Sequence, residues 1–286
     1  MAFALSPSRL LARGPSVIPG FGLTMGITVS WLSFIVLLPL AALVLRATGI
    51  GVDGFADMLA DERVLSALKL SFGAALVGAV INAFSGLLIA WALVRYNFPG
   101  RRLVDGLIDL PFALPTAVSG LALAALYAPN GWLGVPLASL GIKVAYTPLG
   151  VVIACMFIGL PFVVRQVQPV LGDVDKALEE AAATLGATRL QTIFRVILPM
   201  VLPALLAGFA LAFARAVGEY GSIIFIAGNL PYKSEIAPLL IIIKLEEFNY
   251  EAATAIAVIM LALSFVVLLF VNLLQSWGRR RTGLGS

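Results

Sequence analysis

Two opposite charges stand four residues apart within an apolar stretch of the chain. Arg215 and Glu219 occur between Leu198 and Ala227, where most neighbours are aliphatic or small. Residues four apart share one face of a helix, so the two side chains can pair. An arginine beside a path for ions attracts an anion, and a paired glutamate keeps that attraction weak enough for release. A purely structural ion pair is the alternative, because charges in apolar surroundings are costly and pair with one another.

A second apolar stretch combines prolines with hydroxyl groups. Pro115 is followed by Thr116 and Ser119, and Pro111 lies one turn earlier. Proline removes a backbone hydrogen bond and leaves a carbonyl free, while hydroxyls can donate to the oxygens of an anion. Back-bonding of both hydroxyls to their own helix is the alternative. These residues are candidate pathway residues beside the charged pair.

Several chemistries are excluded by residue types that the sequence lacks. It has no histidine, so histidine general bases, Ser-His-Asp triads and His-Cys zinc sites are ruled out. Cys155 is the one cysteine, lies in an apolar run, and has no assigned role. No GxxxxGK[ST] phosphate loop is present. We therefore expect no catalytic residue, metal or cofactor, and any ATP must be bound by another subunit.

Composition places the candidate residues in a membrane. Of 286 residues, 61% are hydrophobic and 12% charged, and the mean hydropathy is +1.04. A soluble domain carries roughly a quarter charged residues, so this chain cannot cover a globular surface with polar groups. A spanning helix needs about 20 apolar residues. Six stretches satisfy this: Phe21–Leu45, Leu68–Val94, Leu103–Tyr127, Thr147–Val167, Leu198–Ala227 and Ala252–Leu274.

The distribution of Lys and Arg predicts the orientation of these spans. One side holds Arg101 and Arg102, Arg189 and Arg195, and the C-terminal arginines, whereas the other side has fewer cations. The positive-inside rule makes the richer side cytoplasmic. The fold class is therefore an all-α integral membrane protein with six transmembrane helices and both termini in the cytoplasm. We expect a cytoplasmic tail over residues 1–20, a permease domain over 21–276, and a basic tail over 277–286.

The loop between the fourth and fifth predicted spans, about residues 170–199, has a helical pattern. Asp173 is a candidate N-cap, Asp175 suits the first turn, and Gly186 can end the helix with a positive φ. A second short helix with Leu190 on its stripe is expected before Pro199. The apolar positions follow the spacing of an amphipathic helix: Val174, Ala177, Leu178, Ala181, Ala182 and Leu185. The pattern suits a helix on lipid headgroups or one that docks into a groove of a partner.

This loop resembles the EAA loop of ABC-importer permeases. That motif reads EAAxxxG, nine residues, then IxLP, and here Glu180, Ala181, Ala182 and Gly186 match its first part. Leu198 and Pro199 match its end, and Val196 replaces the usual Ile. Further segments resemble the sulfate/thiosulfate permease family and its T-type subunits: DLPFALPTAVSGLAL from Asp109, LPFVVRQVQPVL from Leu160, FARAVGEYGSIIFIAGN from Phe213, and EIAPLLI from Glu235.

The resemblance implies a type I ABC-importer architecture in the bacterial inner membrane. It implies as partners a second permease subunit (a related W-type chain or a second copy), two cytoplasmic ATP-binding subunits and a periplasmic sulfate- or thiosulfate-binding protein. It also implies that one group of residues in the loop couples the permease to the ATPase: Glu179, Glu180, Ala181, Ala182, Gly186 and Leu190.

Two other functions are compatible with parts of the sequence. A molybdate or tungstate permease resembles this chain through the same segments and carries another tetrahedral oxyanion. An ion-coupled secondary carrier needs titratable groups at the midplane and often has inverted repeats. Glu219 is the clear titratable candidate, and the sequence has no convincing repeat.

Overall fold

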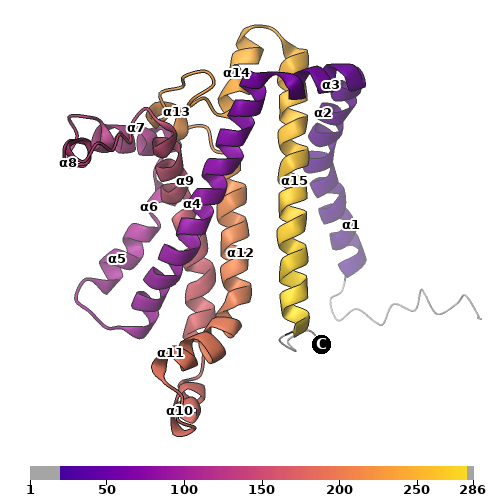
Figure 1. The fold of residues 1–286 in the computed structure, drawn as a ribbon. Coiled ribbons are helices and arrows are strands. Elements are labelled where there is room, and N and C mark those ends of the chain that lie inside the picture. The colour runs from indigo at the N-terminus through magenta and orange to yellow at the C-terminus, as the bar shows by residue number, and fades with distance from the viewer. Residues whose placement is uncertain (1–19, 282–286) are drawn as a thin grey trace, which may run out of the picture. The chain divides into compact units, whose positions relative to one another are not determined.

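The fold of residues 20–281 consists of helices, as the computed structural model shows (Figure 1). Side chains are described as far as Val271 and at Leu273. The predicted tail over residues 1–20 therefore lies outside the described part except for Gly20, as do the last five residues of the predicted basic tail. Two compact units are present, Met1–Gly49 and Ile50–Ser286. Each unit is described by itself.

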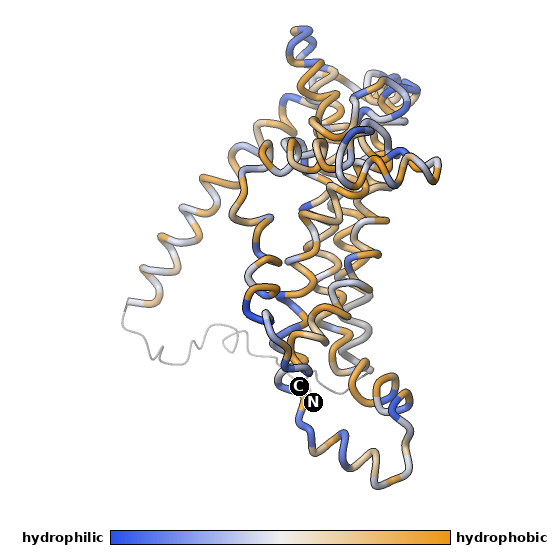
Figure 2. The backbone as a smooth tube through the Cα atoms, turned by 90° about the vertical axis from the view of Figure 1, so that its left-hand side faces the viewer, coloured by the Kyte–Doolittle hydropathy of each residue, from blue (hydrophilic) through white to orange (hydrophobic). Residues whose placement is uncertain are grey.

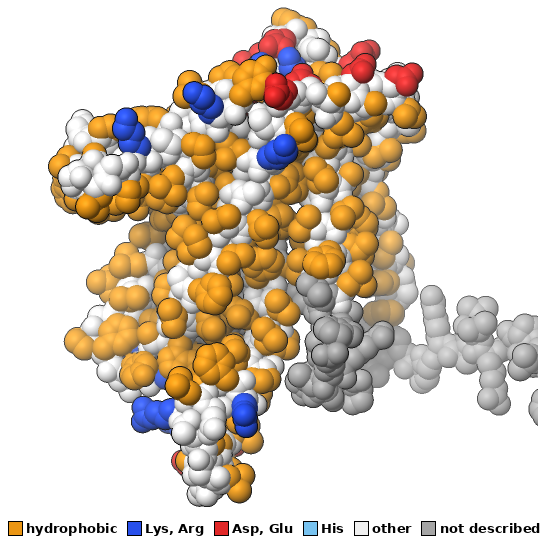
Figure 3. Space-filling view, in the orientation of Figure 1, with side chains coloured by type: hydrophobic (Ala, Val, Ile, Leu, Met, Phe, Trp, Pro, Cys, Tyr) orange, Lys and Arg blue, Asp and Glu red, His pale blue; other side chains and the backbone are white. Residues whose placement is uncertain are grey.

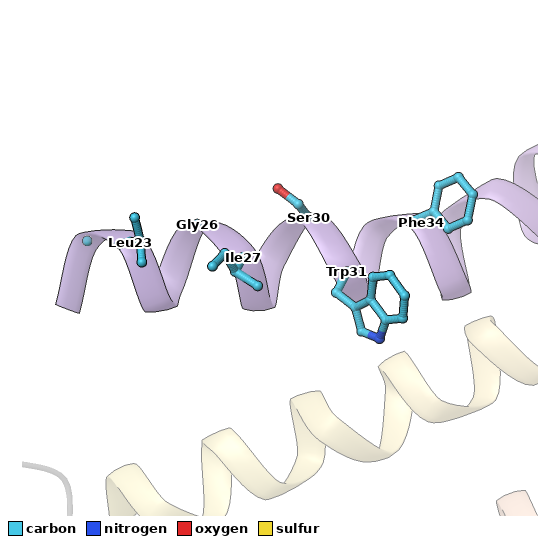
Figure 4. A pocket seen from close by; sticks show the side chains of 7 residues that line it. Leu23, Gly26, Ile27, Ser30, Trp31 and Phe34 are labelled. Atoms are coloured by element: carbon cyan, nitrogen blue, oxygen red, sulfur yellow. The ribbon is translucent and has the colours of Figure 1, made fainter. Parts of the chain in front are cut away.

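The first unit holds one long apolar helix. It consists of α1 (Phe21–Leu32), the π-helical turn η2 (Ser33–Leu37) and α2 (Leu38–Thr48), which together are long enough to span a membrane. Neither α1 nor η2 buries a residue. A shallow groove of about 650 Å³ follows α1, with Leu23, Ile27, Trp31 and Phe34 among its walls (Figure 4). Its lining is apolar apart from Ser30, and none of the candidate site residues belongs to it.

The second unit contains the remaining helices, which pack around three long ones. Figure 2 shows hydrophobic residues along the long helices and hydrophilic ones mainly at their ends. The helices are α3 (Gly51–Ala60), α4 (Glu62–Arg95), α5 (Arg101–Ile108), α6 (Leu110–Ala113), α7 (Thr116–Tyr127), α8 (Gly134–Ser139), α9 (Pro148–Gly172), α10 (Lys176–Thr184), α11 (Arg189–Thr192), η3 (Ile193–Ile197), α12 (Leu198–Val217), α13 (Ile223–Ile226), α14 (Ala237–Glu246) and α15 (Tyr250–Arg281).

Small residues let α4, α9 and α12 pack closely. A methyl group at Gly78 of α4 would lie 3.0 Å from the Cβ of Cys155 in α9, and one at Gly86 would lie 2.7 Å from Val163 Cγ1. Such close approach is typical of helix packing in membranes, where dispersion contacts replace the hydrophobic effect. Cys155 is buried in this interface, so its environment is that of a small core residue.

The stretch predicted as the third span, Leu103–Tyr127, is not one helix. It is divided among α5, α6 and α7, and five helices of the described chain are long and apolar enough to cross a membrane. Leu114 is extended, with φ −82° and ψ 137°, because the residue before a proline is disfavoured in the helical region. Pro115 then begins α7 as its N-cap. The sequence places Asp105, Asp109, Pro111 and Pro115 in the first half of this span as interruptions, and the helix is broken in that half.

The fifth predicted span also differs from the structure. The expected helix over Leu198–Ala227 ends at Val217, because Gly218 and the residues after it turn away before α13. At its other end the helix is longer than predicted, since α11, η3 and α12 form one apolar helix over Arg189–Val217. The separate second short helix predicted before Pro199 is therefore part of this spanning helix.

Charged side chains gather at the ends of the second unit. Figure 3 shows acidic side chains at the end that holds α14, above a wide apolar flank. Asp53, Asp57, Glu246 and Glu247 are exposed there. We call this the α14 end, and the opposite end, which holds α10 and α11, the α10 end (Figure 1). An apolar flank between charged ends is the arrangement that a bilayer requires.

Candidate functional site

The predicted pair of Arg215 and Glu219 forms at the end of α12. Glu219 lies beyond the last helical residue, and its Oε1 accepts hydrogen bonds from the backbone N and the Oγ of Ser222, each at 3.0 Å. The Glu219 side chain is 2% exposed, whereas that of Arg215 is 38% exposed. The Glu219 carboxylate is thus bonded inside the protein, whereas the Arg215 side chain is only partly covered.

The start of α7 lies against the turn that holds Glu219. A methyl group at Gly221 would lie 3.0 Å from Thr116 Cβ, and one at Gly120 would lie 2.8 Å from Ser222 Cα. Glycine at both positions permits this approach. The structure therefore brings the two groups of candidate pathway residues together, although they are about a hundred positions apart in the sequence.

The hydroxyl groups of α7 differ in their surroundings. The Ser119 Oγ donates to the Pro115 carbonyl at 3.4 Å, and Ser119 is buried. It therefore follows the local back-bonding alternative. Thr116 is half-buried at the first turn of α7, directly after the exposed Pro115. The Thr116 Oγ1 lies against Gly221, since a methyl group there would overlap with it.

The predicted coupling loop, about residues 170–199, contains the capped helix α10, but the cap is not the one expected. Asp175 is the N-cap of α10, and its carboxylate accepts a hydrogen bond from Ala177 N at 2.9 Å. The prediction of Asp173 as the cap was wrong, because α9 continues to Gly172 and Asp173 caps its C-terminal end. Residues 173–175 alone then separate α9 from α10.

The turn between α10 and α11 is set by one glycine and one capping box. Gly186 has a φ of 82°, as predicted. The Thr188 hydroxyl accepts from Gln191 N at 3.3 Å, and the Gln191 side chain accepts from Thr188 N at 2.8 Å. These reciprocal bonds define the start of α11. The two helices are therefore joined by a turn of fixed geometry.

The amphipathic helix α10 turns its apolar face away from the rest of the chain. Leu178 is 43% exposed and Leu185 is 89% exposed, and Ala177 and Ala181 are exposed as well. Glu179 and Ala182 are half-buried, whereas the other predicted coupling residues are exposed: Glu180, Ala181, Gly186 and Leu190. An apolar face without a partner at the tip of the molecule is suited to docking against another protein.

An ion network that the sequence analysis missed fastens the broken segment to α9. Arg165 donates from Nη1 to Asp105 Oδ1 at 2.7 Å and to Gln168 Oε1 at 2.7 Å. It also donates from Nε and Nη2 to the Asp109 carboxylate at 2.9 and 2.6 Å. Charge-assisted bidentate bonds of this kind are strong and directional. The available signal was the pair of aspartates one turn apart in an otherwise apolar stretch, which required a cation.

A second missed pair stabilises the α14 end. Arg63, at the start of α4, donates from Nε and Nη2 to the two carboxylate oxygens of Glu235 at 2.8 and 2.7 Å. Close by, the backbone N of Ala237 donates to Ser71 Oγ at 2.8 Å and so links the start of α14 to α4. Glu235 is 2% exposed, so it is part of the internal structure and not a free surface group.

The chain matches a known family over most of its length. Residues 82–282 match the family described as binding-protein-dependent transport system inner membrane component. The chain is 49% identical over 282 residues to the sulfate transport system permease protein CysT of Escherichia coli strain K12, covering 98% of this chain and 99% of that protein. It is 46% identical over 275 residues to the protein of the same name from Synechocystis, with 96% of each covered.

Solved transporter structures share the fold. A bacterial alginate ABC transporter in complex with a periplasmic protein matches with a TM-score of 0.72 and 20% identity, covering 92% of this chain and 94% of the other. The MetNI methionine ABC transporter matches with a TM-score of 0.54 and 17% identity, covering 75% and 94%. These comparisons confirm the predicted family resemblance and the permease architecture of the fold.

Proposed function

The chain belongs to the family of binding-protein-dependent transport system inner membrane components, and from this premise we propose that it is the permease subunit of an ATP-driven importer of sulfate and thiosulfate. The observation that carries the proposal is the identity of 46–49% over nearly the whole chain with proteins named sulfate transport system permease. The molybdate and secondary-carrier alternatives are not favoured by these relatives. The chain performs transport only, and hydrolysis of ATP belongs to partner subunits.

The arrangement of the importer follows from the two ends of the molecule. The α10 end faces the cytoplasm and meets one of two ATP-binding subunits through the apolar face of α10, where Leu178 and Leu185 are exposed. The α14 end faces the periplasm and a substrate-binding protein. A second permease subunit, of the related W type or a second copy, completes the conduit in the bacterial inner membrane. Both termini lie in the cytoplasm, and α5 to α7 together make the sixth crossing.

The path for the anion runs beside Arg215. The partly exposed Arg215 side chain offers attraction to a dianion, and the buried Glu219 that pairs with it makes the pair neutral overall and so weakens that attraction. Weak attraction suits a conduit, because an ion that is held tightly does not leave. Thr116 and Ser119, with the kink at Pro115, lie on the neighbouring α7, which packs against the turn that holds Glu219.

Competition between oxyanions tests the substrate. The complete importer is reconstituted with its binding protein, and uptake of radiolabelled sulfate is measured with unlabelled thiosulfate or molybdate in excess. We expect thiosulfate to suppress sulfate uptake to background and molybdate to leave most of it intact. Sulfate uptake that excess molybdate abolishes and excess thiosulfate leaves intact would show that the substrate assignment is wrong while leaving the permease assignment in place.

A further inference from the structure

An ion pair joins α10 to α4, the first of the three long helices of the second unit. Arg95 is the last residue of α4, and its Nη2 lies 2.6 Å from Oε1 of Glu179 in α10. The Arg95 side chain is 14% exposed and that of Glu179 is 33% exposed. Among the residues that the structure describes, this is the ion pair that ties α10 to a membrane-spanning helix. It links segments that are more than eighty positions apart in the sequence.

Arg95 is held in position from its own helix. Its guanidinium carbon lies 5.8 Å from the ring centroid of Trp91, one turn earlier in α4. An arginine over an aromatic face is stabilised by the ring quadrupole and loses some of its freedom. The guanidinium is therefore presented to α10 in a defined place, so little further ordering is needed when it meets Glu179.

The space around the pair is loosely filled. A groove of about 480 Å³ separates the end of α4 from α10 and α11, and its lining includes Trp91, Arg95, Glu179 and Ala187. The other charged groups that line it are Lys176, Glu180 and Arg189. Because a groove occupies this boundary, apolar packing contributes little across it, and the ion pair forms a direct bridge.

The two faces of α10 thus meet different surfaces. The apolar face, with Leu178 and Leu185, is exposed, whereas Glu179 on the charged face forms an ion pair with Arg95 of the same chain. A partner that moves α10 also moves α9 and α12, because the backbone connects α10 to α9 on one side and, through α11 and η3, to α12 on the other. The ion pair adds a third connection, directly to α4, which packs along both of those helices.

We propose that Arg95 is a positioning residue for energy coupling, which acts through Glu179 to pass movement of α10 to α4. This inference rests on the proposed function, because it assumes that α10 is driven by an ATPase. It assigns Glu179 to a contact inside the permease, while the neighbouring Glu180 is exposed at the rim of the same groove and has no ion pair with Arg95. The coupling loop then drives three core helices and not two.

The test compares coupling with assembly in the complete importer. Arg95→Gln and Glu179→Gln complexes are purified with their partner subunits, and sulfate uptake and ATP hydrolysis are measured on the same proteoliposomes. We expect normal copurification and a fall of about two- to fivefold in sulfate taken up per ATP hydrolysed, as suits the loss of a partly exposed ion pair. The exchanged pair, Arg95→Glu with Glu179→Arg, is expected to restore the ratio.

A matched control removes a charge without removing this pair. Lys176→Gln lies on the same helix and in the same groove, and it should leave the ratio unchanged. An unchanged ratio in both single variants would overturn the proposal, as would loss of assembly in both, which would make the pair a folding contact. If the unmodified complex itself shows no ATP-dependent uptake, the proposed function fails and not this inference alone.

Discussion

Replacement of Gly186 by valine is expected to leave the importer assembled and hydrolysing ATP but unable to move sulfate efficiently. Gly186 has a φ of 82°, and a Cβ at this position would meet nothing within 4 Å. The penalty is therefore confined to the backbone, at about 1–2 kcal/mol for a left-handed residue with a side chain and more for a β-branched one. The valine variant escapes this strain by changing the turn, and this redirects α10 relative to α11.

The measurement is the amount of sulfate taken up per ATP hydrolysed in proteoliposomes. We expect this ratio to fall about tenfold, because a factor of ten corresponds to roughly 1.4 kcal/mol. Gly186→Asn is the matched control, because asparagine tolerates the left-handed region, and it should retain most coupling. Gly172→Val tests valine itself at a nearby exposed position with an ordinary φ and open space. Full coupling in the Gly186→Val complex would show that the turn has no mechanical role.

Arg215→Ala is expected to lower sulfate transport by about tenfold or more, since each ~1.4 kcal/mol of lost stabilisation of the ion along its path is worth one decade in rate. The variant removes the cation with an accessible edge at the end of α12. It also strands the carboxylate of Glu219, which is 2% exposed, and an unpaired buried charge is destabilising. Uptake and the yield of assembled complex must therefore be measured together.

Two further variants separate the transport role of Arg215 from its structural role. Arg215→Ala combined with Glu219→Gln removes both charges, so assembly should recover while uptake stays low. Arg215→Lys keeps a cation and should retain part of the uptake. If the double variant transports sulfate normally, the pair is a structural ion pair that screens itself, and Arg215 has no part in the pathway.

Local patterns in the sequence predicted much of this structure. Continuous apolar runs identified the long helices, because hydropathy over twenty residues depends on composition and not on long-range contacts. Gly186 was found from its place after an amphipathic helix, and Arg215 with Glu219 from a four-residue spacing. In each case the deciding interaction lies within one turn of chain, so the sequence alone contains the necessary information.

The errors arose where the chain leaves regular structure inside an apolar stretch. Hydropathy marked Leu103–Tyr127 as one span, and Asp109 and Pro115, visible in the sequence as interruptions of its first half, divide it into separate helices. Hydropathy also extended the fifth span past Val217, although Gly218 ends that helix. Apolar composition does not report helix ends when the irregular segment is as apolar as the helices on either side of it, because a window of about twenty residues averages over the break.

Long-range ion pairs were beyond prediction for a different reason. Arg165 binds Asp105 and Asp109, and Arg95 binds Glu179. Each pair depends on how helices pack, and a single sequence does not specify which distant charges meet. Charged residues in or beside apolar runs nevertheless mark positions that need a partner, and this signal was present at all five residues.

The central claim is that a separate ATPase drives this conduit through the exposed face of α10. Uptake of labelled sulfate into proteoliposomes, measured with and without the ATPase subunits and with ATP supplied on the α10 side, tests it most directly. The account predicts uptake only when the ATPase subunits and ATP are both present. Sulfate movement that continues undiminished without those subunits would contradict it.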